Sequence, residues 1–416
     1  MNIKQDVKVL APVGSWESLR AAVQAGADAV YFGIEQLNMR ARSSINFTLE
    51  DLEQIAGICK EEGIGSYITI NTILYDHDLK LMRHIIDTAK ASGIDAIIAM
   101  DHAAINYANE IGMPVHISTQ VNITNIESVK FYAKFSEVMV LSRELTLQQV
   151  EYICAQVKKQ NITAPSGNLV QIETFVHGAL CMAVSGKCYM SLHTMNSSAN
   201  RGACKQNCRR SYTVKDEDGN ELKIDNEYIM SPKDLCTINF VDKIMDAGVK
   251  VLKIEGRSKG PEYVFETTNC YRQAVDAWKN DVPFTPELVM EWEKRLSAVY
   301  NRGFWGGYFM GKKMGEWADK EGSIATEEKV YLGKGKKYFD KIGVGEFKLD
   351  NGELKVGDEI LITSREHGIF KTKVSEIRLD NQESAGVVKR GQVFSMPIEI
   401  KIRPSDNLYK IVARQQ

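Results

Sequence analysis

The sequence lacks the features of secreted and membrane proteins. Its first residues, MNIKQDVKVLAPVGS, contain no apolar core of a signal peptide, and no apolar run approaches the roughly 20 residues that span a bilayer. Lysine and arginine (52) nearly balance aspartate and glutamate (54), so the formal net charge is only -2. We therefore expect a cytoplasmic protein without membrane contact, in which any nucleic-acid contact depends on a local basic patch.

Several common enzyme and metal motifs are also missing. No GxGxxG follows the first expected strand, and neither the HExxH of zinc peptidases nor the GxSxG of serine hydrolases occurs. The paired C-x2-C knuckles of zinc ribbons and the C-x2-C-x2-C run of ferredoxins are absent too. These absences argue against a dinucleotide-binding sheet, a zinc peptidase, a serine hydrolase and a zinc ribbon.

The first two thirds of the chain alternate short apolar runs with helical patterns, which is typical of a parallel α/β fold. Eight runs are predicted as strands, at residues 7–12, 29–33, 66–71, 96–101, 115–120, 137–144, 171–178 and 249–257. Thr48 is expected to cap the helix that follows it, and Gly63 and Gly93 to end helices. Eight strands complete a TIM-like (β/α)8 barrel over residues 1–315, which we prefer to a doubly wound open sheet.

The pattern changes beyond the barrel. Residues 281–315 contain the helical stretch PELVMEWEKRLSAVYN and then RGFWGGYFMG, which suits a lid or a linker. From 325 to 416, period-two strands predict a small antiparallel β-barrel with an Asn-Gly hairpin turn in LDNGEL. Residues 326–416 hold 17 Lys and Arg against 14 Asp and Glu, an excess of 3. Either a phosphate-contacting patch or a solvated strand edge explains the lysines Lys334, Lys336, Lys337 and Lys341.

Polar side chains follow the ends of the expected strands. In barrels of this kind, catalytic groups lie where the strands end at the C-terminal face. The side chains at these ends are Asn71, Asp101, Gln120, Asn122, Arg143, Glu144, His177, Glu255 and Arg257. A purely structural end more often carries glycine, serine or a lone aspartate, so their convergence predicts an active site at this face.

Five of the eight cysteines belong to an insertion after the seventh expected strand, at about residues 179–236. Their spacing is Cys181-x6-Cys188-x15-Cys204-x3-Cys208, then 27 residues to Cys236. In a reducing compartment, thiols gathered at one end of a barrel hold a metal or a cluster rather than form disulfides. Four thiolates complete a [4Fe-4S] cluster and leave one cysteine over, while structural zinc is the alternative for a four-sulfur site.

Basic side chains and histidines accompany these cysteines. They are His177, His193, Arg201, Lys205, Arg209 and Arg210. Cations near a cluster favour the thiolates and bind anionic substrates, although a solvated basic loop explains the same residues. His177 is a candidate functional group because it ends the seventh strand, whereas lone histidines are more often structural.

Seven motifs, spread from about residue 8 to 310, are shared with a known family: HGALC, SGKCYMS, ANRGACKQNCR, SPKDLC, VLKIEGRSKGPEYV, HISTQVNITN and LSRELT. They resemble the collagenase-like peptidases, a U-type family of unclassified peptidases. Several members are oxygen-independent hydroxylases that carry an iron–sulfur cluster. Its length and C-terminal module make this chain most similar to the tRNA members, which convert the wobble uridine to 5-hydroxyuridine with prephenate as the implied oxygen donor.

The resemblance also implies ligands and partners. The cluster ligands map to Cys181, Cys188, Cys204 and Cys236, with Cys208 as the alternative to Cys204 in the RGxCxxxC stretch. The implied partners are tRNA, held by the insertion and the C-terminal module, and prephenate. Some related members also act with a paralogous partner protein.

Roles for the remaining polar groups follow from this co-substrate. Arg143 and Arg257 are expected to bind the two carboxylates of prephenate, because a guanidinium pairs with a carboxylate in bidentate geometry. Glu144 and Glu255 would orient these arginines or act as acid and base, unless each Arg–Glu neighbour is a structural ion pair. His177 is counted with these catalytic candidates. The expected substrate-binding side chains are Asn71, Gln120, Asn122 and Arg201.

Two other functions compete with an RNA hydroxylase. The family name suggests a peptidase, but a cysteine peptidase needs one reactive thiol beside a histidine rather than four or five gathered thiols. The third candidate is a zinc-stabilised RNA-binding or accessory protein without catalysis. The identity of the bound metal separates this third function from the hydroxylase.

Overall fold

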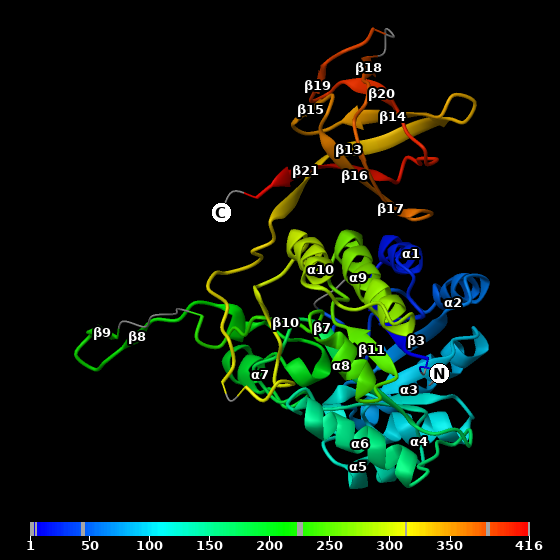
Figure 1. Cartoon of the computed structure of the whole chain (residues 1–416), viewed down its shortest axis with the longest axis vertical. Helices are drawn as coiled ribbons and strands as arrows, with labels where there is room; N and C mark the ends of the chain where they lie inside the picture. Colours follow the sequence, from blue (N-terminus) through cyan, green and yellow to red (C-terminus); the bar gives the residue numbers. More distant parts are fainter. Residues whose placement is uncertain are drawn as a thin grey trace.

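A closed barrel of eight parallel strands forms the centre of the computed structural model (Figure 1). The structure describes residues 4, 6–42, 46–222, 228–312, 314–379 and 383–414. The barrel strands are β1 (Lys8–Pro12), β2 (Ala29–Phe32), β3 (Gly65–Ile70), β4 (Ala96–Ala99), β5 (Val115–Ile117), β6 (Val138–Val140), β7 (Gln171–Gly178) and β11 (Val251–Ile254). Each pairs with the next, and β11 pairs with both β1 and β7, so the sheet closes. The predicted TIM-like barrel is confirmed, and the open-sheet alternative is wrong.

Amphipathic helices cover the outside of the barrel. They are α1 (Trp16–Gln24), α2 (Leu52–Glu61), α3 (Leu79–Ala91), α4 (His102–Glu110), α5 (Ile126–Tyr132), α6 (Leu147–Lys159), α8 (Val241–Asp246) and α9 (Pro261–Lys279), with α10 (Pro286–Ala298) packed against α9. In α3 the buried residues Met82, Ile85, Ile86 and Ala89 recur at helical spacing, so one stripe faces the strands. Among the described residues, no helix is long and apolar enough to cross a membrane.

Several element ends differ from the sequence prediction. β5 stops at Ile117 and β6 at Val140, where the chain leaves the sheet for the loops above it. Thr48 is not the helix cap: α2 begins at Leu52 with Asp51 at its N-cap, and the Thr48 backbone N–H donates to the Asp51 carboxylate at 2.8 Å. The expected helix ends at Gly63 and Gly93 are confirmed, each with a positive φ directly after its helix.

The insertion leaves the barrel after β7 and returns before α8. It contains α7 (Met190–Met195), the short turns η3 (Ala199–Arg201) and η4 (Asn207–Arg209), a β8–β9 hairpin (Val214–Lys215 and Glu221–Leu222) and β10 (Asp234–Cys236). Figure 1 shows β8 and β9 projecting away from the barrel. β10 runs antiparallel to the end of β7 and parallel to β12 (Phe304–Trp305), which follows α10, so the insertion adds one short strand to the barrel sheet and β12 adds another.

The C-terminal residues form antiparallel sheets with a core of their own. The larger sheet has the order β17-β16-β21-β13-β14-β20-β18, and β15 pairs with β19. These strands are β13 (Glu327–Phe339), β14 (Val344–Leu349), β15 (Glu353–Lys355), β16 (Glu359–Ser364), β17 (Gly368–Lys373), β18 (Arg378–Leu379), β19 (Val387–Lys389), β20 (Val393–Pro397) and β21 (Asn407–Ala413). Phe347 and Phe394 stack in the core at 5.7 Å between ring centroids. This unit is called the C-terminal module below.

The predicted hairpin in LDNGEL is wrong. This segment connects β14 to β15, but β14 pairs with β13 and β20, while β15 pairs with β19. A type I′ turn needs two consecutive positive φ angles. Only Gly352 has one here, and the backbone N–H groups of Asp350 and Asn351 both donate to Leu332 of β13 instead. The turn therefore redirects the chain to a second sheet.

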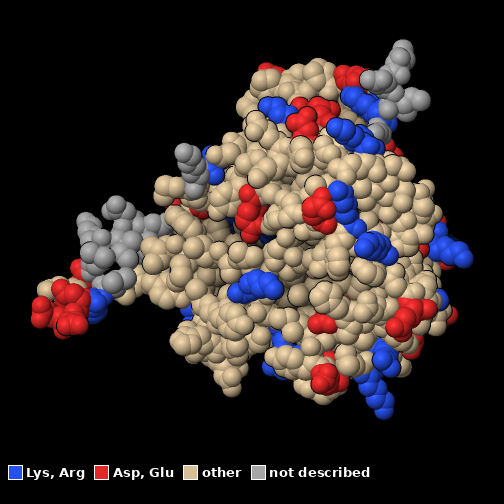
Figure 2. Space-filling view, turned by 90° about the horizontal axis from the view of Figure 1, so that it is seen from below, with Lys and Arg blue, Asp and Glu red and all other residues tan. Residues whose placement is uncertain are grey.

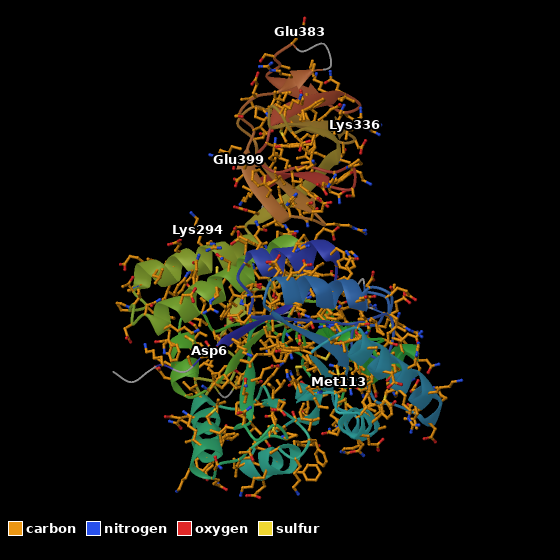
Figure 3. All side chains as sticks on the ribbon, turned by 90° about the vertical axis from the view of Figure 1, so that its right-hand side faces the viewer. Asp6, Met113, Lys294, Lys336, Glu383 and Glu399 are labelled. Carbon is orange, nitrogen blue, oxygen red and sulfur yellow. The ribbon has the colours of Figure 1, made fainter. Side chains whose placement is uncertain are left out.

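The C-terminal module docks on α1 and α9, on the outside of the barrel (Figure 3). Leu361 and Ile369 of the module form a small buried cluster with Ala21 of α1. The amide of Gln24 donates to the Ile369 carbonyl at 3.0 Å, and a further ion pair joins Lys329 and Glu262 at 2.7 Å. Apolar packing and specific polar contacts thus fix the module to the barrel.

Gly368, at the tip of the docked hairpin, tests this interface. It has a φ of +73°, and an added Cβ would lie 2.8 Å from the backbone nitrogen of Ala21. Gly357 of the same module has a φ of +92° with no atom within 4 Å, which makes it a matched control. We expect Gly357→Ala to cost about 1–2 kcal/mol of module stability through the left-handed backbone alone.

Gly368→Ala should cost more, and it should also loosen the docking itself. The check is thermal unfolding together with limited proteolysis of the segment between α10 and β13. Equal proteolysis of the two variants would contradict a tight contact at Gly368.

Candidate functional site

A cavity of about 210 Å³ opens at the C-terminal ends of the barrel strands. Loops from around the barrel line it: Arg40 follows β2, Asn71 follows β3, Gln120 follows β5 and Arg143 follows β6. The segment after β11 contributes Glu255, Arg257 and Lys259, and the insertion contributes Cys181, Cys188, Asn200, Cys204, Cys208 and Arg209. The predicted convergence of strand ends therefore coincides with a real cavity.

Glu255 lies at the centre of the charged groups in this cavity. Its carboxylate pairs with Arg40 at 2.8 Å and faces the hydroxyl of Tyr31 at 3.4 Å. Burial alone would raise the pKa of Glu255, but Arg40, Arg143 and Arg257 outweigh it and lower this pKa to about 2. Glu255 is therefore an anion at neutral pH that orders the arginines around it, rather than an acid that supplies a proton.

The two arginines predicted to bind a dicarboxylate have different surroundings. Arg257 is buried, and one of its terminal nitrogens donates to Asn38 at 3.2 Å and to Thr69 at 2.7 Å. Arg143 lies over the Phe175 ring at 3.8 Å and donates to the Ala179 carbonyl at 2.8 Å. Its buried Nε has no hydrogen-bond partner among the described residues. Arg143 therefore keeps one donor without a partner among the described residues, whereas Arg257 has polar partners within the barrel.

Asn71 and Gln120 are joined in one polar network on the cavity wall. The Asn71 amide donates to the Gln120 side-chain oxygen at 3.4 Å and to Ser118 at 3.3 Å. Ser118 also donates to Gln120. Asn122 does not line the cavity; its amide holds the insertion against the barrel by donating to the Ser185 carbonyl at 3.0 Å. Of the three predicted amides, two lie in the cavity and one supports it.

Three other predicted residues lie outside the cavity lining. Glu144 is exposed and accepts a hydrogen bond from Ser142. Arg201 pairs with Asp78 at 2.7 Å and stacks on the Tyr75 ring at 4.3 Å, so it ties the insertion to the loop after β3. Asp101, another strand-end residue, caps α4 by accepting from the backbone of Ala103 at 2.9 Å. These positions have evident structural contacts.

His177 is also outside the lining, because β7 carries a bulge just before it. Phe175 pairs with Lys253 and His177 with the next residue, Ile254, so Val176 is the extra residue. A bulge of this kind turns the following side chain to another direction. His177 is 1% exposed inside a box of Tyr263, Tyr271 and Phe304. Burial lowers its pKa to about 3, so its imidazole is neutral.

The cysteines divide into a cavity group and a buried group. Cys181, Cys188, Cys204 and Cys208 line the cavity, and the other three thiols and burial together raise the pKa of Cys208. Cys236, predicted as the fourth ligand, instead lies buried on β10 beside Tyr271, where burial raises its pKa to about 12. The structure therefore brings Cys208, and not Cys236, to the other three thiols.

The four cavity thiols are not arranged around one point. Within the described part of the chain, no three His, Cys, Asp or Glu side chains are close enough together to hold a single metal ion. A cluster of four irons binds each thiolate through a different iron, so it spaces its ligands more widely than a single ion does. The donor set, four thiols on one cavity, fits such a cluster.

Sequence analysis missed several cations of the cavity. Arg40 lies in the loop after β2, whose end carries no polar residue, and Arg302 precedes β12, a strand that was not predicted. Lys253 was noted only within its motif. A lysine inside an apolar strand signals a buried partner, and here Lys253 pairs with Glu173 at 2.6 Å, both nearly inaccessible to water. These residues raise the positive charge of the site well above the prediction.

The lining as a whole is strongly cationic. Apart from the thiols and the Tyr31 hydroxyl, the ionisable groups among the described lining residues are one carboxylate, Glu255, and seven basic side chains: Arg40, Arg143, Arg209, Lys253, Arg257, Lys259 and Arg302. Glu173 and Asp234 pair with two of these cations from behind the wall. Such a cavity suits an anion small enough to enter it.

A comparison with known families matches residues 14–319 to peptidase family U32, and the chain belongs to this family. A protein named collagenase from Porphyromonas gingivalis (strain ATCC BAA-308 / W83) is 55% identical over 417 residues, covering 100% of both chains. The tRNA hydroxylation protein P1 of Bacillus subtilis (strain 168) is 31% identical over 317 residues, which cover 74% of this chain and 72% of that protein.

A further relative is the 23S rRNA 5-hydroxycytidine C2501 synthase of Escherichia coli (strain K12). It is 35% identical over 276 residues, covering 65% of this chain and 39% of that protein. The family resemblance drawn from the motifs is thus confirmed. The similar proteins are named as peptidases or as RNA hydroxylation proteins. These names support the prediction that this protein is an enzyme.

The buried Lys253–Glu173 pair below the cavity generates a stability prediction. Removing one partner leaves a buried charge without compensation, which typically costs about 3–5 kcal/mol. We expect Glu173→Gln to lower the thermal unfolding midpoint by several degrees. The double variant Glu173→Leu/Lys253→Met should recover most of that loss, since it leaves no unpaired charge. A double variant that is no more stable than the single one would contradict the pairing.

Proposed function

We propose that this protein is an RNA-modifying hydroxylase that acts without molecular oxygen. Its substrate is the wobble uridine of tRNA, its product is 5-hydroxyuridine, and its co-substrate is prephenate. A [4Fe-4S] cluster is held by Cys181, Cys188, Cys204 and Cys208. The observation that carries the proposal is the coincidence of four thiols and a cationic cavity at the C-terminal face of the barrel, in a chain related to proteins named for tRNA and rRNA hydroxylation.

The choice of Cys208 over Cys236 rests on environment. A thiolate ligand must lose its proton, and neighbouring cations favour that loss. Burial and the other cavity thiols raise the pKa of Cys208, and the neighbouring Arg209 partly offsets this rise. Cys236 is fully enclosed next to Tyr271, where burial dominates. When bound, the cluster would supply one-electron redox chemistry at the cavity wall.

The charge of the cavity supports prephenate, a dicarboxylate, as co-substrate. Arg143 lines the cavity with its guanidinium on the Phe175 face, and its buried Nε has no partner among the described residues, which supports it as the group that binds one carboxylate. Glu255, kept ionised by its arginines, holds Arg40 in place. Asn71 and Gln120 offer neutral hydrogen-bonding groups in the same cavity. These residues bind and orient an anion without supplying protons.

The peptidase alternative receives less support from the same site. Across the β7–β10 pairing, His177 and Cys236 are direct partners, which superficially resembles a cysteine peptidase. However, burial raises the pKa of Cys236 to about 12 and lowers that of His177 to about 3. A thiolate–imidazolium pair is therefore strongly disfavoured, and neither residue lines the cavity.

RNA contact depends on local features, since charges of both signs are interspersed on the face in Figure 2. In the C-terminal module, Lys336 pairs with Glu346 at 3.4 Å and Lys337 lies over Phe339, as expected for a solvated strand edge. An unstacked anticodon-loop base is accessible to a cavity of this kind. The proposed route for the base is therefore through the cavity mouth, next to the insertion.

Metal analysis of matched cysteine variants tests the cluster. After anaerobic purification, the native protein should contain about four irons and four sulfides per chain, with cluster absorbance and EPR signals. Cys208→Ala should lose most of both, because one iron loses its ligand. Cys236→Ala should retain them. Loss of iron and sulfide in Cys236→Ala alone would instead support Cys236 as the fourth ligand, as the motifs imply. One zinc per chain without iron would support a zinc-stabilised accessory protein.

Nucleoside mass spectrometry tests the reaction. Expression of this chain in a bacterial strain without its own tRNA hydroxylation proteins should produce 5-hydroxyuridine in tRNA. Arg143→Met should reduce the product roughly 10- to 100-fold through the lost charged hydrogen bond. 5-Hydroxycytidine in rRNA would instead point to the other named reaction of the family. No modified nucleoside, together with cleavage of collagen by cluster-free protein, would contradict the hydroxylase.

A further inference from the structure

Lys259 occupies an unusual position at the cavity. It lies in the loop between β11 and α9, where its backbone N–H donates to the Gly256 carbonyl at 2.8 Å and closes a turn. Its side chain is partly buried, lines the cavity and places the ammonium over the face of the Tyr300 ring. Within the described residues, this ammonium has a ring contact but no hydrogen-bond acceptor and no ion-pair partner.

The other charged groups near Lys259 already have partners. Arg302, which lies over the same Tyr300 ring, pairs with Asp234 of β10 at 3.3 Å. Arg40 pairs with Glu255 at 2.8 Å. The carboxylates of Asp234 and Glu255 are thus each paired with an arginine. Lys259 is left next to cations and an aromatic face, without an anion of its own.

These surroundings disfavour the charged amine. Burial and the neighbouring Arg302 lower the pKa of Lys259 to about 7, against the smaller opposing effects of Asp234 and Glu255; Arg40 acts in the same direction as Arg302. A carboxylate placed beside the amine would reverse this balance, because an opposite charge stabilises the protonated form. An anion that enters the cavity would supply the opposite charge that Lys259 lacks among the described residues.

We propose that Lys259 is a specificity-determining residue that binds one carboxylate of an anionic substrate and takes up a proton as it does so. With Arg143 at the other subsite, this gives the cavity two separate carboxylate-binding groups. The inference rests on the proposed function only in taking prephenate as the natural anion, since the proton uptake follows from any carboxylate that reaches Lys259.

The direction of the pH dependence follows from this arrangement. Below the pKa of the empty site, Lys259 is already charged and binding needs no proton. Above that pKa, each bound anion must bring a proton with it, so affinity falls as the pH rises. Proton uptake should approach about one per bound anion at pH 8 and be much smaller at pH 6.

Isothermal titration calorimetry of the anaerobically purified full chain tests the proposal. Prephenate, and separately malonate as a simple dicarboxylate, are titrated at pH 6 and pH 8 in buffers of different ionisation enthalpy. The dependence of the observed heat on the buffer gives the number of protons taken up. We expect uptake at pH 8 for both probes.

Two variants separate a binding role from a structural one. Lys259→Arg keeps its charge at every pH, so binding should persist while the uptake disappears. Lys259→Met should weaken binding roughly 10- to 100-fold at pH 6, where the native amine is charged. Unchanged thermal unfolding of Lys259→Met would show that the lost affinity does not arise from misfolding.

The outcomes distinguish this inference from the proposed function. Malonate binding with proton uptake but no prephenate binding would support Lys259 as the carboxylate group and contradict prephenate as co-substrate. Binding of either probe without uptake, or with uptake unchanged in Lys259→Met, would overturn the role of Lys259 while leaving the hydroxylase intact. Failure of both probes to bind at either pH would overturn both.

Discussion

The parallel pairing of β7 with β11 closes the barrel, and the site is arranged around this seam. It places Glu173 of β7 next to Val251, within reach of Lys253, and so forms the buried ion pair below the cavity. It also fixes where the insertion leaves the barrel after β7. The cavity thiols and the charged segment from Glu255 to Lys259 therefore line the same cavity although they lie far apart in the sequence.

Neighbouring charges and burial have opposite effects on whether side chains near this seam are ionised. Inside the cavity, the arginines hold Glu255 ionised against the cost of its burial. Behind the cavity wall, no opposite charge among the described residues compensates the burial of His177 and Cys236, so both are held neutral. Ionisable side chains that look equally functional in the sequence thus have different roles. Those that line the cavity can bind an anion, and those behind its wall only pack.

The sequence was sufficient to predict the barrel because its strands are apolar runs buried on both faces, as the wholly buried AVYF of β2 illustrates. It also identified the strand-end amides and arginines, since chain direction alone brings those ends to one face. It was not sufficient where a local irregularity decides direction. One extra residue at Val176 turns His177 away from the cavity, and the antiparallel return of β10 buries Cys236. Spacing along a chain does not encode either event.

The contact between the C-terminal module and the barrel has a mechanical consequence. Lys329 of β13 pairs with Glu262 in the first turn of α9, only three residues after Lys259. A tilt of the module relative to the barrel would therefore pull on the first turn of α9, next to the loop that borders the cavity. The docking contacts on α1 and α9 thus end in the helix that begins next to the mouth of the site.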